Sequence, residues 1–320
     1  MSQEVHVAET RTLRVTGKEP VADGVVALTL ADPDGGRLPD WTPGAHIDLI
    51  LPSGMVRQYS LCGDRWDAYS YRIAVLREQN GRGGSAYIHD DLDLGEAVGL
   101  GGPRNNFPLV PAERYLFIAG GIGITPLLPM IAQADLLGAD WQLLYGGRRE
   151  ASLAFGQDLA GYGDRVHLRP EDRYGLLDLP GFLDAWQPGT RVYCCGPAPL
   201  LAAVEQACAG LPQHTLRTER FTASTLTGPA RSTPFEIELA RSKTVVTVPA
   251  DSSVLDVLAA AGADVLSSCR QGVCGTCEIT VLAGEPDHRD SVLDDTERAA
   301  STCMFACVSR SRSDRLVVDL

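Results

Sequence analysis

The chain has 320 residues, enough for about two domains of ordinary size, and its 44% hydrophobic and 22% charged residues exclude a largely disordered protein. Its 28 Lys and Arg residues face 41 Asp and Glu residues, and the formal net charge of −13 argues against nonspecific nucleic-acid binding. Such a surface favours docking to a basic patch on another protein. The N-terminus lacks the apolar core of a signal peptide, so we expect a cytoplasmic protein.

Residues 115–132 form an apolar stretch that contains three glycines and two prolines. We therefore interpret it as a buried strand, a turn and a helix, and we expect no membrane span. The nine cysteines of such a protein are expected to serve metal binding, redox chemistry or core packing before disulfides.

Before Pro108, short β-like runs are separated by glycine and proline, the pattern of an antiparallel barrel. The run at 57–61 (RQYSL) alternates, which places Arg57 and Tyr59 on one face, where arginine can hold a phosphate and tyrosine can lie against an aromatic ring. Residues 80–85 (NGRGGS) precede a short helix and form a second candidate phosphate cradle. A polar strand or a surface turn explains either motif alone, but their joint presence favours a binding site. The expected strands are residues 25–30, 46–51, 57–61 and 71–77, and the helix is 86–92.

After Pro111, strands alternate with helices, which predicts a parallel α/β sheet. Residues 120–126 (GGIGITP) follow a buried strand, and we expect Thr125 to cap the next helix and Pro126 to begin it. Amide groups there can bind a pyrophosphate, although a turn without ligand is an equal alternative. The expected strands are residues 115–119, 142–145, 166–168 and 191–194, and the helices are 126–137 and 199–209.

Residues 192–197 (VYCCGP) form a second strand-to-turn unit at the same edge of that sheet. Ligands bind at the carboxyl ends of parallel strands, so Cys195 can face a planar ring. Core packing is the commoner role for a lone cysteine. Downstream, residues 222–234 show no apolar pattern and are expected to form a linker that reaches at most about 45 Å.

Five of the nine cysteines lie between positions 269 and 307, and three of them form C-x4-C-x2-C at Cys269, Cys274 and Cys277. This spacing is that of plant-type 2Fe–2S ferredoxins. Expected strands at 244–248 and 278–282 and a helix at 253–261 indicate a β-grasp-like half-barrel. Two alternatives are a zinc site of Cys274, Cys277, Cys303 and Cys307, which leaves Cys269 without a role, and buried cysteines without metal. The spacing leaves open whether Cys303 or Cys307 is the fourth ligand of a cluster.

Taken together, these motifs resemble the phthalate dioxygenase reductase family over nearly the whole chain. The resemblance rests on residues 57–62, 81–85, 119–126, 193–197, 269–277, 287–290 (DHRD) and 307–310 (CVSR). It implies a multidomain fold, with an antiparallel β-barrel for flavin, an α/β parallel-sheet nicotinamide domain and a C-terminal β-grasp ferredoxin domain. The implied boundaries are 1–108 for the barrel, 109–221 for the nicotinamide domain, 222–234 for the linker and 235–320 for the ferredoxin.

The resemblance also implies the cofactors and their residues. FMN, rather than FAD, is expected in the barrel, NADH on the parallel sheet, and one 2Fe–2S cluster whose fourth ligand is Cys307. Leu76 stands where relatives often carry lysine, so one polar flavin contact is expected to be missing. Cys195 and Phe221 are the candidate catalytic residues, with Phe221 near the flavin ring. The candidate cofactor-binding residues are Arg57, Gln58, Tyr59, Ser60, Ala74, Val75, Leu76, Arg82, Gly83, Gly84, Ser85, Gly121, Gly123, Thr125, Gly196 and Pro197, and the candidate metal ligands are Cys269, Cys274, Cys277 and Cys307.

The cofactors define the expected reaction. Nicotinamide gives up two electrons together as a hydride, a 2Fe–2S cluster accepts one at a time, and a flavin handles both. We expect an NADH-dependent reductase for a separate oxygenase, either a Rieske non-haem iron oxygenase or a haem-thiolate monooxygenase. The alternatives are a stand-alone diaphorase or quinone reductase and, from another class, a zinc-stapled nucleotide sensor without turnover. Arg148 and Arg149 lie about where a 2′-phosphate of NADPH would bind, but surface arginines are the commoner explanation.

Overall fold

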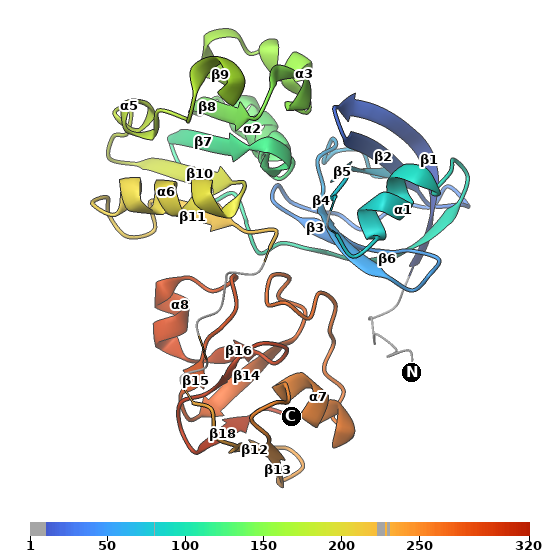
Figure 1. Ribbon diagram of the computed structural model, residues 1–320, viewed down its shortest axis with the longest axis vertical. Coiled ribbons are helices and arrows are strands. Elements are labelled where there is room, and N and C mark those ends of the chain that lie inside the picture. Colours follow the sequence, from blue (N-terminus) through green and yellow to red (C-terminus); the bar gives the residue numbers. More distant parts are fainter. Residues whose placement is uncertain (1–10, 80, 223–227, 229–230) are drawn as a thin grey trace. The chain divides into compact units, whose positions relative to one another are not determined.

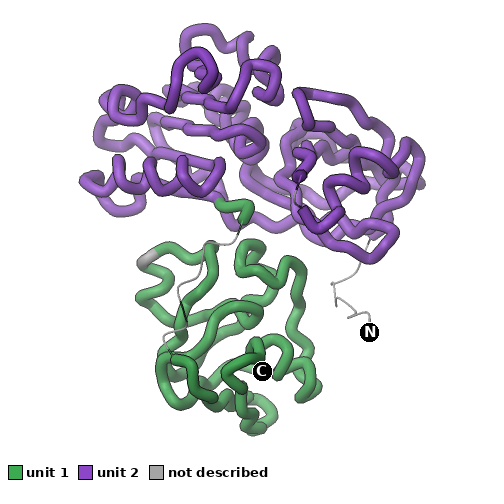
Figure 2. Tube along the Cα trace, in the orientation of Figure 1, with its two compact units in different colours: residues 1–9, 220–320 green, residues 10–219 purple. Residues whose placement is uncertain are grey.

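The computed structural model describes residues 11–79, 81–222, 228 and 231–320 (Figure 1). The described residues form two compact units, a larger one that ends at Glu219 and a smaller one of Arg220–Leu320 (Figure 2). Most of the expected linker, at positions 223–227 and 229–230, lies outside the described residues. Within the part described, no helix has the length and apolar composition that crossing a membrane requires.

The larger unit begins with a six-stranded antiparallel sheet in the order β4-β3-β6-β1-β2-β5. A bridge between Leu61 and Ile73 links the end of β4 to β5, and a core that includes Leu13, Leu28 and Ile47 fills the interior. These contacts produce the expected barrel. Its elements are β1 (Arg11–Ala22), β2 (Val25–Ala31), β3 (His46–Ile50), β4 (Val56–Ser60), β5 (Ser70–Leu76), α1 (Gly84–Asp90) and β6 (Ala97–Arg104).

The second half of the larger unit is a five-stranded parallel sheet in the order β11-β10-β7-β8-β9. All its carboxyl ends therefore lie at one edge, as expected for a nucleotide-binding sheet. The strands are β7 (Arg114–Gly120), β8 (Asp140–Gly147), β9 (Val166–Pro170), β10 (Thr190–Cys195) and β11 (Leu216–Glu219). The helices are η1 (Gly121–Ile124), α2 (Leu127–Leu136), η2 (Glu150–Ser152), α3 (Gly156–Ala160), η3 (Gly163–Arg165), α4 (Glu171–Tyr174), α5 (Leu179–Leu183) and α6 (Ala198–Cys208).

One hydrophobic cluster joins the two halves of the larger unit. It includes Ala27 and Ala74 of the barrel together with Ile124 and Leu127 beside the parallel sheet. The barrel and the parallel sheet therefore share a packed core, which fixes the two relative to each other.

The smaller unit is a mixed sheet in the order β13-β12-β18-β14-β16, in which β12 and β18 are parallel. Helix α7 begins after Ser253, whose hydroxyl accepts a hydrogen bond from the Asp256 N–H and caps the helix. The expected β-grasp-like architecture is confirmed. Its elements are β12 (Phe235–Leu239), β13 (Thr244–Val248), α7 (Val254–Ala260), β14 (Glu278–Ala283), β15 (Pro286–Asp287), α8 (Asp295–Ala300), β16 (Cys303–Phe305), β17 (Arg310–Ser311) and β18 (Arg315–Val318).

Candidate cofactor sites

Arg57 on β4 lies against the start of α1. Its guanidinium donates a hydrogen bond to the Arg82 carbonyl oxygen (2.9 Å), and a Cβ added to Gly84 would lie 2.5 Å from Arg57 Nε. Only glycine at position 84 lets the guanidinium approach the backbone this closely. Burial and the nearby Arg82 charge lower the pKa of Arg57. Two cationic side chains beside an unhindered backbone suit a phosphate.

The neighbouring flavin candidates gather around this cradle. Tyr59 and Tyr87 of α1 pack against the same barrel core, and burial raises the pKa of the Tyr59 phenol. Ser60 is buried, and the Ser85 hydroxyl accepts a hydrogen bond from the Glu78 N–H (3.1 Å). The remaining candidates are Gly83, at φ +83° before α1, and Ala74, Val75 and Leu76 on β5.

Gln58 differs from its neighbours on β4. Its side-chain amide donates to Asp48 Oδ1 (2.8 Å), and the other oxygen of Asp48 is 2.6 Å from Arg104 Nη2. Because residues alternate along a strand, the Gln58 side chain lies on the face opposite to Arg57 and Tyr59. The structure thus commits the Gln58 side chain to a buried ion pair and leaves only its backbone on the expected flavin strand.

On the parallel sheet, the two glycine-bearing turns touch each other. A Cβ added to Gly123 would collide with the Cys195 carbonyl group, and one added to Gly196 would lie 3.0 Å from Gly120 Cα. The turn at 120–123 and the turn at 195–197 are therefore packed backbone against backbone. This arrangement leaves Gly121, Gly123, Gly196 and Pro197 at one sheet edge.

The expected cap at Thr125 is wrong. Pro126 occupies the N-cap position of α2, and the Thr125 hydroxyl instead donates to the Ile122 carbonyl oxygen (3.0 Å). The turn winds into the short η1 helix before α2 starts, and the Thr125 N–H also donates to the Ile122 carbonyl oxygen (3.2 Å). Tyr145 of β8 braces it, because its hydroxyl donates to the Gly121 carbonyl oxygen (3.1 Å). Nothing in the local sequence pattern indicated this contact.

A carboxyl group that sequence reasoning missed lies beside Cys195. The parallel register of β10 and β11 places Glu219 opposite Cys195, and Glu219 Oε2 is 4.0 Å from Cys195 Sγ. Burial raises the pKa of Glu219 to about 8, and burial followed by the Glu219 charge raises the pKa of Cys195. At neutral pH both groups are therefore largely uncharged. An acidic residue at the end of the last parallel strand was the available signal.

The cysteine loop of the smaller unit follows α7. Its sulfur atoms accept hydrogen bonds from the backbone, from Gln271 N–H to Cys269 Sγ (3.3 Å) and from Thr276 N–H to Cys274 Sγ (3.4 Å). Gly272 and Gly275 have φ of +70° and +74°, which turns the loop tightly. Amide groups directed at sulfur are what a bound iron–sulfur cluster requires.

The thiols of Cys269, Cys274, Cys277 and Cys307 lie together. Cys269 as hydrogen-bond partner, and then burial, raise the pKa of Cys274. Cys307 has two thiol neighbours. Cys269 lowers the pKa of Cys307, whereas Cys277 and burial raise it, and the net result is a pKa of about 12. Cys303 instead has Glu278, Asp290 and Glu297 as charged neighbours. The structure thus groups Cys307, not Cys303, with the loop cysteines.

The zinc alternative included Cys303 and left out Cys269, whereas the structure groups Cys269 with the other thiols and leaves Cys303 outside. A zinc ion needs four ligands around one centre, whereas a 2Fe–2S cluster divides four thiolates between two iron atoms. The four thiols fit the cluster.

Phe221 follows β11 and lies in the smaller unit, with 41% of its surface exposed. Its expected place beside the flavin stays a prediction. A cavity of about 450 Å³ lies elsewhere on the barrel, between Trp41, Trp66 and Arg104, and none of the candidate cofactor residues lines it.

Known proteins resemble this chain along its whole length. The sequence profile of the 2Fe-2S iron-sulfur cluster binding domain matches residues 237–312. Phenoxybenzoate dioxygenase subunit beta of Ectopseudomonas oleovorans is 44% identical, over 97% of this chain and 97% of that protein. Tetrachlorobenzoquinone reductase of Sphingobium chlorophenolicum is 40% identical, over 97% of this chain and 98% of that protein.

Solved structures agree. Phthalate dioxygenase reductase, described as a modular structure for electron transfer from pyridine nucleotides to 2Fe-2S, matches at a TM-score of 0.71 and 38% identity, over 97% of this chain and 98% of that one. An intact type IV self-sufficient cytochrome P450 monooxygenase matches at a TM-score of 0.92 and 42% identity, over 100% of this chain. This chain spans 43% of that longer protein.

The fold, the sites and these matches define a flavin- and 2Fe–2S-containing oxidoreductase that takes electrons from a reduced nicotinamide nucleotide. More particularly, the chain belongs to the phthalate dioxygenase reductase family. The zinc-stapled sensor without turnover is therefore wrong.

Proposed function

We propose that this chain is the reductase component of an oxygenase system, which takes electrons from NADH through FMN and the 2Fe–2S cluster to a separate oxygenase. The acceptor is a Rieske non-haem iron oxygenase or a haem-thiolate monooxygenase. The observation that carries the proposal is the four-thiol loop on the same chain as the nicotinamide and flavin unit. The dioxygenase subunit and the P450 enzyme among its relatives support an oxygenase as the acceptor.

The charge of the Arg57 cradle supports FMN. The terminal phosphate of FMN is a monoester with a charge close to −2 at neutral pH, while each phosphate of FAD is a diester with a single charge. Arg82 lies close enough to Arg57 to lower the pKa of Arg57. Two neighbouring cations match the more highly charged phosphate of FMN. Heat release of the flavin and its mass test this assignment.

When bound, nicotinamide supplies a hydride, the flavin exchanges one or two electrons, and the cluster accepts one. The residues of the chain position and shield these groups: Arg57 holds phosphate, Tyr59 offers a ring face, and the turns at 120–123 and 195–197 hold nucleotide. Cys195 and Glu219, both largely uncharged at neutral pH, keep this sheet edge free of negative charge beside the nicotinamide. Phe221 covers the flavin until nicotinamide arrives, and unchanged hydride-transfer kinetics in Phe221→Ala would contradict that role.

NADH is the proposed donor, as the family resemblance implies. Arg148 and Arg149 follow β8 and are both exposed, so the chain presents cations near the end of the second strand. Steady-state kinetics decide the matter, since a kcat/KM ratio that favours NADPH would reverse the assignment.

The proposed organisation is three domains and a linker. The flavin barrel spans residues 1–108, the nicotinamide domain 109–221, the linker 222–234 and the ferredoxin domain 235–320. We also propose the cytoplasm as the compartment, where NADH is supplied. The described cysteines are all free thiols, in keeping with a reducing environment.

A stand-alone quinone reductase is the second candidate, because tetrachlorobenzoquinone reductase is 40% identical to this chain. In that case quinone accepts electrons directly and no protein partner is required. The two functions differ in whether the cluster is needed for the physiological acceptor.

Cys274→Ser tests the choice, with Cys303→Ser as the matched control outside the ligand group. We expect Cys274→Ser to abolish electron delivery to a candidate oxygenase or to cytochrome c, and to retain NADH-dependent ferricyanide reduction. Cys303→Ser should retain both. Equal survival of both activities in Cys274→Ser would contradict the oxygenase-reductase proposal and favour the quinone reductase.

A further inference from the structure

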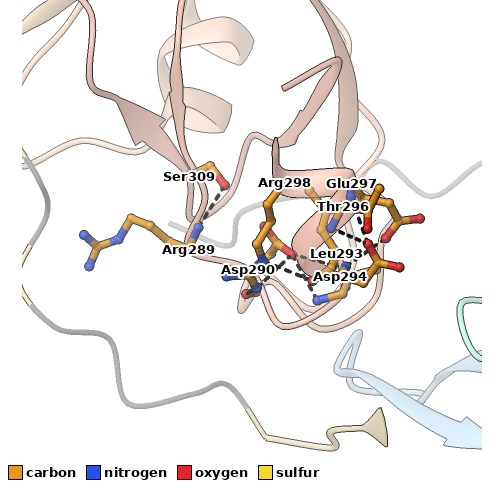
Figure 3. A network of polar contacts seen from close by, with 9 residues as sticks. Arg289, Asp290, Leu293, Asp294, Thr296, Glu297, Arg298 and Ser309 are labelled. Carbon is orange, nitrogen blue, oxygen red and sulfur yellow. Dashed lines mark hydrogen bonds and ion pairs between the residues drawn. The ribbon is translucent and has the colours of Figure 1, made fainter. Parts of the chain in front are cut away.

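Asp290, in the segment between β15 and α8, carries a buried carboxylate. Its side chain has no exposed surface, and its Oδ2 accepts hydrogen bonds from Val292 N–H (3.0 Å) and Leu293 N–H (2.8 Å). Its Oδ1 is buried and finds no hydrogen-bond partner among the residues that the structure describes. Figure 3 shows the carboxylate among these groups, next to the separate capping network of Asp294. A buried carboxylate with an unused oxygen is costly, which indicates that the charge has a purpose here.

The segment of Asp290 and Ser291 supports the cysteine loop. Gly272, two residues before Cys274, accepts a hydrogen bond from Ser291 N–H at its carbonyl oxygen (2.8 Å). A Cβ added to Gly272 would lie 3.1 Å from Asp290 Cα and 2.6 Å from Cγ2 of Val308, the residue after Cys307. The Asp290 segment, the loop and the strand end that carries the fourth cysteine are therefore in direct contact.

The charge of Asp290 is only partly compensated. Arg298 uses Nη2 for the Asp290 carbonyl oxygen (2.7 Å) and Nε for the Leu293 carbonyl oxygen (3.0 Å), so its ion pair with Asp290 Oδ2 is long, at 3.8 Å. The Arg298 side chain is also 36% exposed, where water screens its charge. Burial and the Glu278 charge are the two largest causes that raise the pKa of Cys303, and the Asp290 charge is the next. Its field therefore reaches the Cys303 sulfur atom. A Cβ added to Gly272 would also lie 3.4 Å from Asp290 Cβ, so the Asp290 side chain starts beside the cysteine loop.

We infer that Asp290 is a positioning residue for the 2Fe–2S cluster: it packs against the Gly272 turn, which the neighbouring Ser291 N–H holds, and its buried charge lowers the reduction potential of the cluster. A reduced cluster carries one more negative charge than an oxidised one, and an uncompensated carboxylate nearby disfavours that added charge. A lower potential favours onward release of the electron to an acceptor. This inference rests on the proposed cluster at the four cysteines.

The test is a mediated redox titration of the full-length protein loaded with flavin and cluster, followed by the iron–sulfur absorption and electron paramagnetic resonance. Asp290→Asn should shift the potential upward. Asp294→Asn is the control, because it removes the same charge at an exposed site and asparagine is an equally good helix cap. Its shift should be severalfold smaller.

Arg298→Gln supplies the second measurement, because it removes the partly compensating cation. We expect the potential to move downward, opposite to the Asp290→Asn shift. Loosening of the loop without an electrostatic role would move both variants in the same direction, and that result, or equal shifts in Asp290→Asn and Asp294→Asn, overturns the inference. Absence of iron from the wild-type protein would instead refute the proposed function itself.

Discussion

Asp48 in the larger unit and Asp290 in the smaller unit both have side chains with no exposed surface, and they are held in different ways. Asp48 contacts side chains, with Arg104 Nη2 at 2.6 Å and Gln58 Nε2 at 2.8 Å. Asp290 receives backbone N–H groups, and its cation stands 3.8 Å away. In the barrel, Arg104 balances the Asp48 charge, and the Asp48 side chain also holds Gln58 on β4. Beside the cysteine loop the Asp290 charge is left largely uncancelled, so it can act on the cluster. Burial alone does not distinguish these two roles; the position of the counter-charge does.

The largest expected effect is on stability. Asp48→Asn leaves the Arg104 guanidinium without its ionic partner on the outer face of the barrel sheet, where the Asp48 side chain is fully buried, which should cost about 3 kcal/mol of unfolding free energy. Asp290→Asn removes no close ion pair and should cost about 1 kcal/mol. All four tryptophans lie at positions 41–186, so fluorescence during urea unfolding follows the larger unit, while loss of iron–sulfur absorption follows the smaller one. A greater cost in Asp290→Asn would contradict the comparison.

The Gly272 turn should be the next most sensitive position. In Gly272→Ala, an alanine must adopt a left-handed φ, which costs about 1–2 kcal/mol of stability. Its added Cβ would also overlap with Val308 and Asp290. We expect the iron content per chain to fall severalfold at unchanged flavin content. Gly262→Ala is the matched control, since its φ of +79° carries the same penalty but its Cβ meets nothing within 4 Å. Equal iron content in the two variants would show that the turn does not hold the cluster.

The corresponding close approach in the barrel is Gly84 against Arg57. Gly84→Ala displaces the guanidinium, and we expect flavin affinity to fall about tenfold, or about 1.4 kcal/mol. Gly210→Ala, whose Cβ meets nothing within 4 Å, should bind flavin as the wild type does. Fluorescence titration of flavin-free protein measures both, and equal affinities would remove Arg57 from the cradle.

Glu219 should give an effect that is visible only as a pH dependence. Its pKa is about 8 in the folded chain against an ordinary value of 4.5, so between these values the folded state holds a proton that the unfolded state has released. Stability from this group therefore falls as pH rises from about 4.5 through 8. Glu219→Gln should flatten that slope in urea midpoints measured by tryptophan fluorescence. Parallel pH profiles for the two proteins would contradict the buried, uncharged carboxyl.

The sequence predicted the architecture because its signals were local. Alternation at 57–61 and the apolar runs before each glycine turn predicted strands that the structure confirms. The strands it missed were β1, β6, β11, β12 and β15–β18. In β1, exposed polar residues and Pro20 hide the apolar positions Leu13 and Val15, and β18 pairs with β12 about 80 residues away. Pairing at such separation leaves no local pattern.

The sites were predictable only as far as motifs reach. Spacing predicted the loop cysteines, but spacing alone could not separate Cys303 from Cys307. Glu219 and Asp290 were not predicted as site residues, because their surroundings come from sheet register in one case and a loop contact with Gly272 in the other. Thr125 shows the opposite error, in which a familiar capping residue found a partner within its own turn.

The most direct test of the account is anaerobic rapid mixing of NADH with the cluster-loaded protein, with and without flavin. Flavin-loaded protein should lose its flavin absorption first and its broad iron–sulfur absorption second, and flavin-free protein should keep its iron–sulfur absorption unchanged. Bleaching of that absorption at the same rate without flavin would contradict the claim that the flavin stands between a two-electron donor and a one-electron cluster.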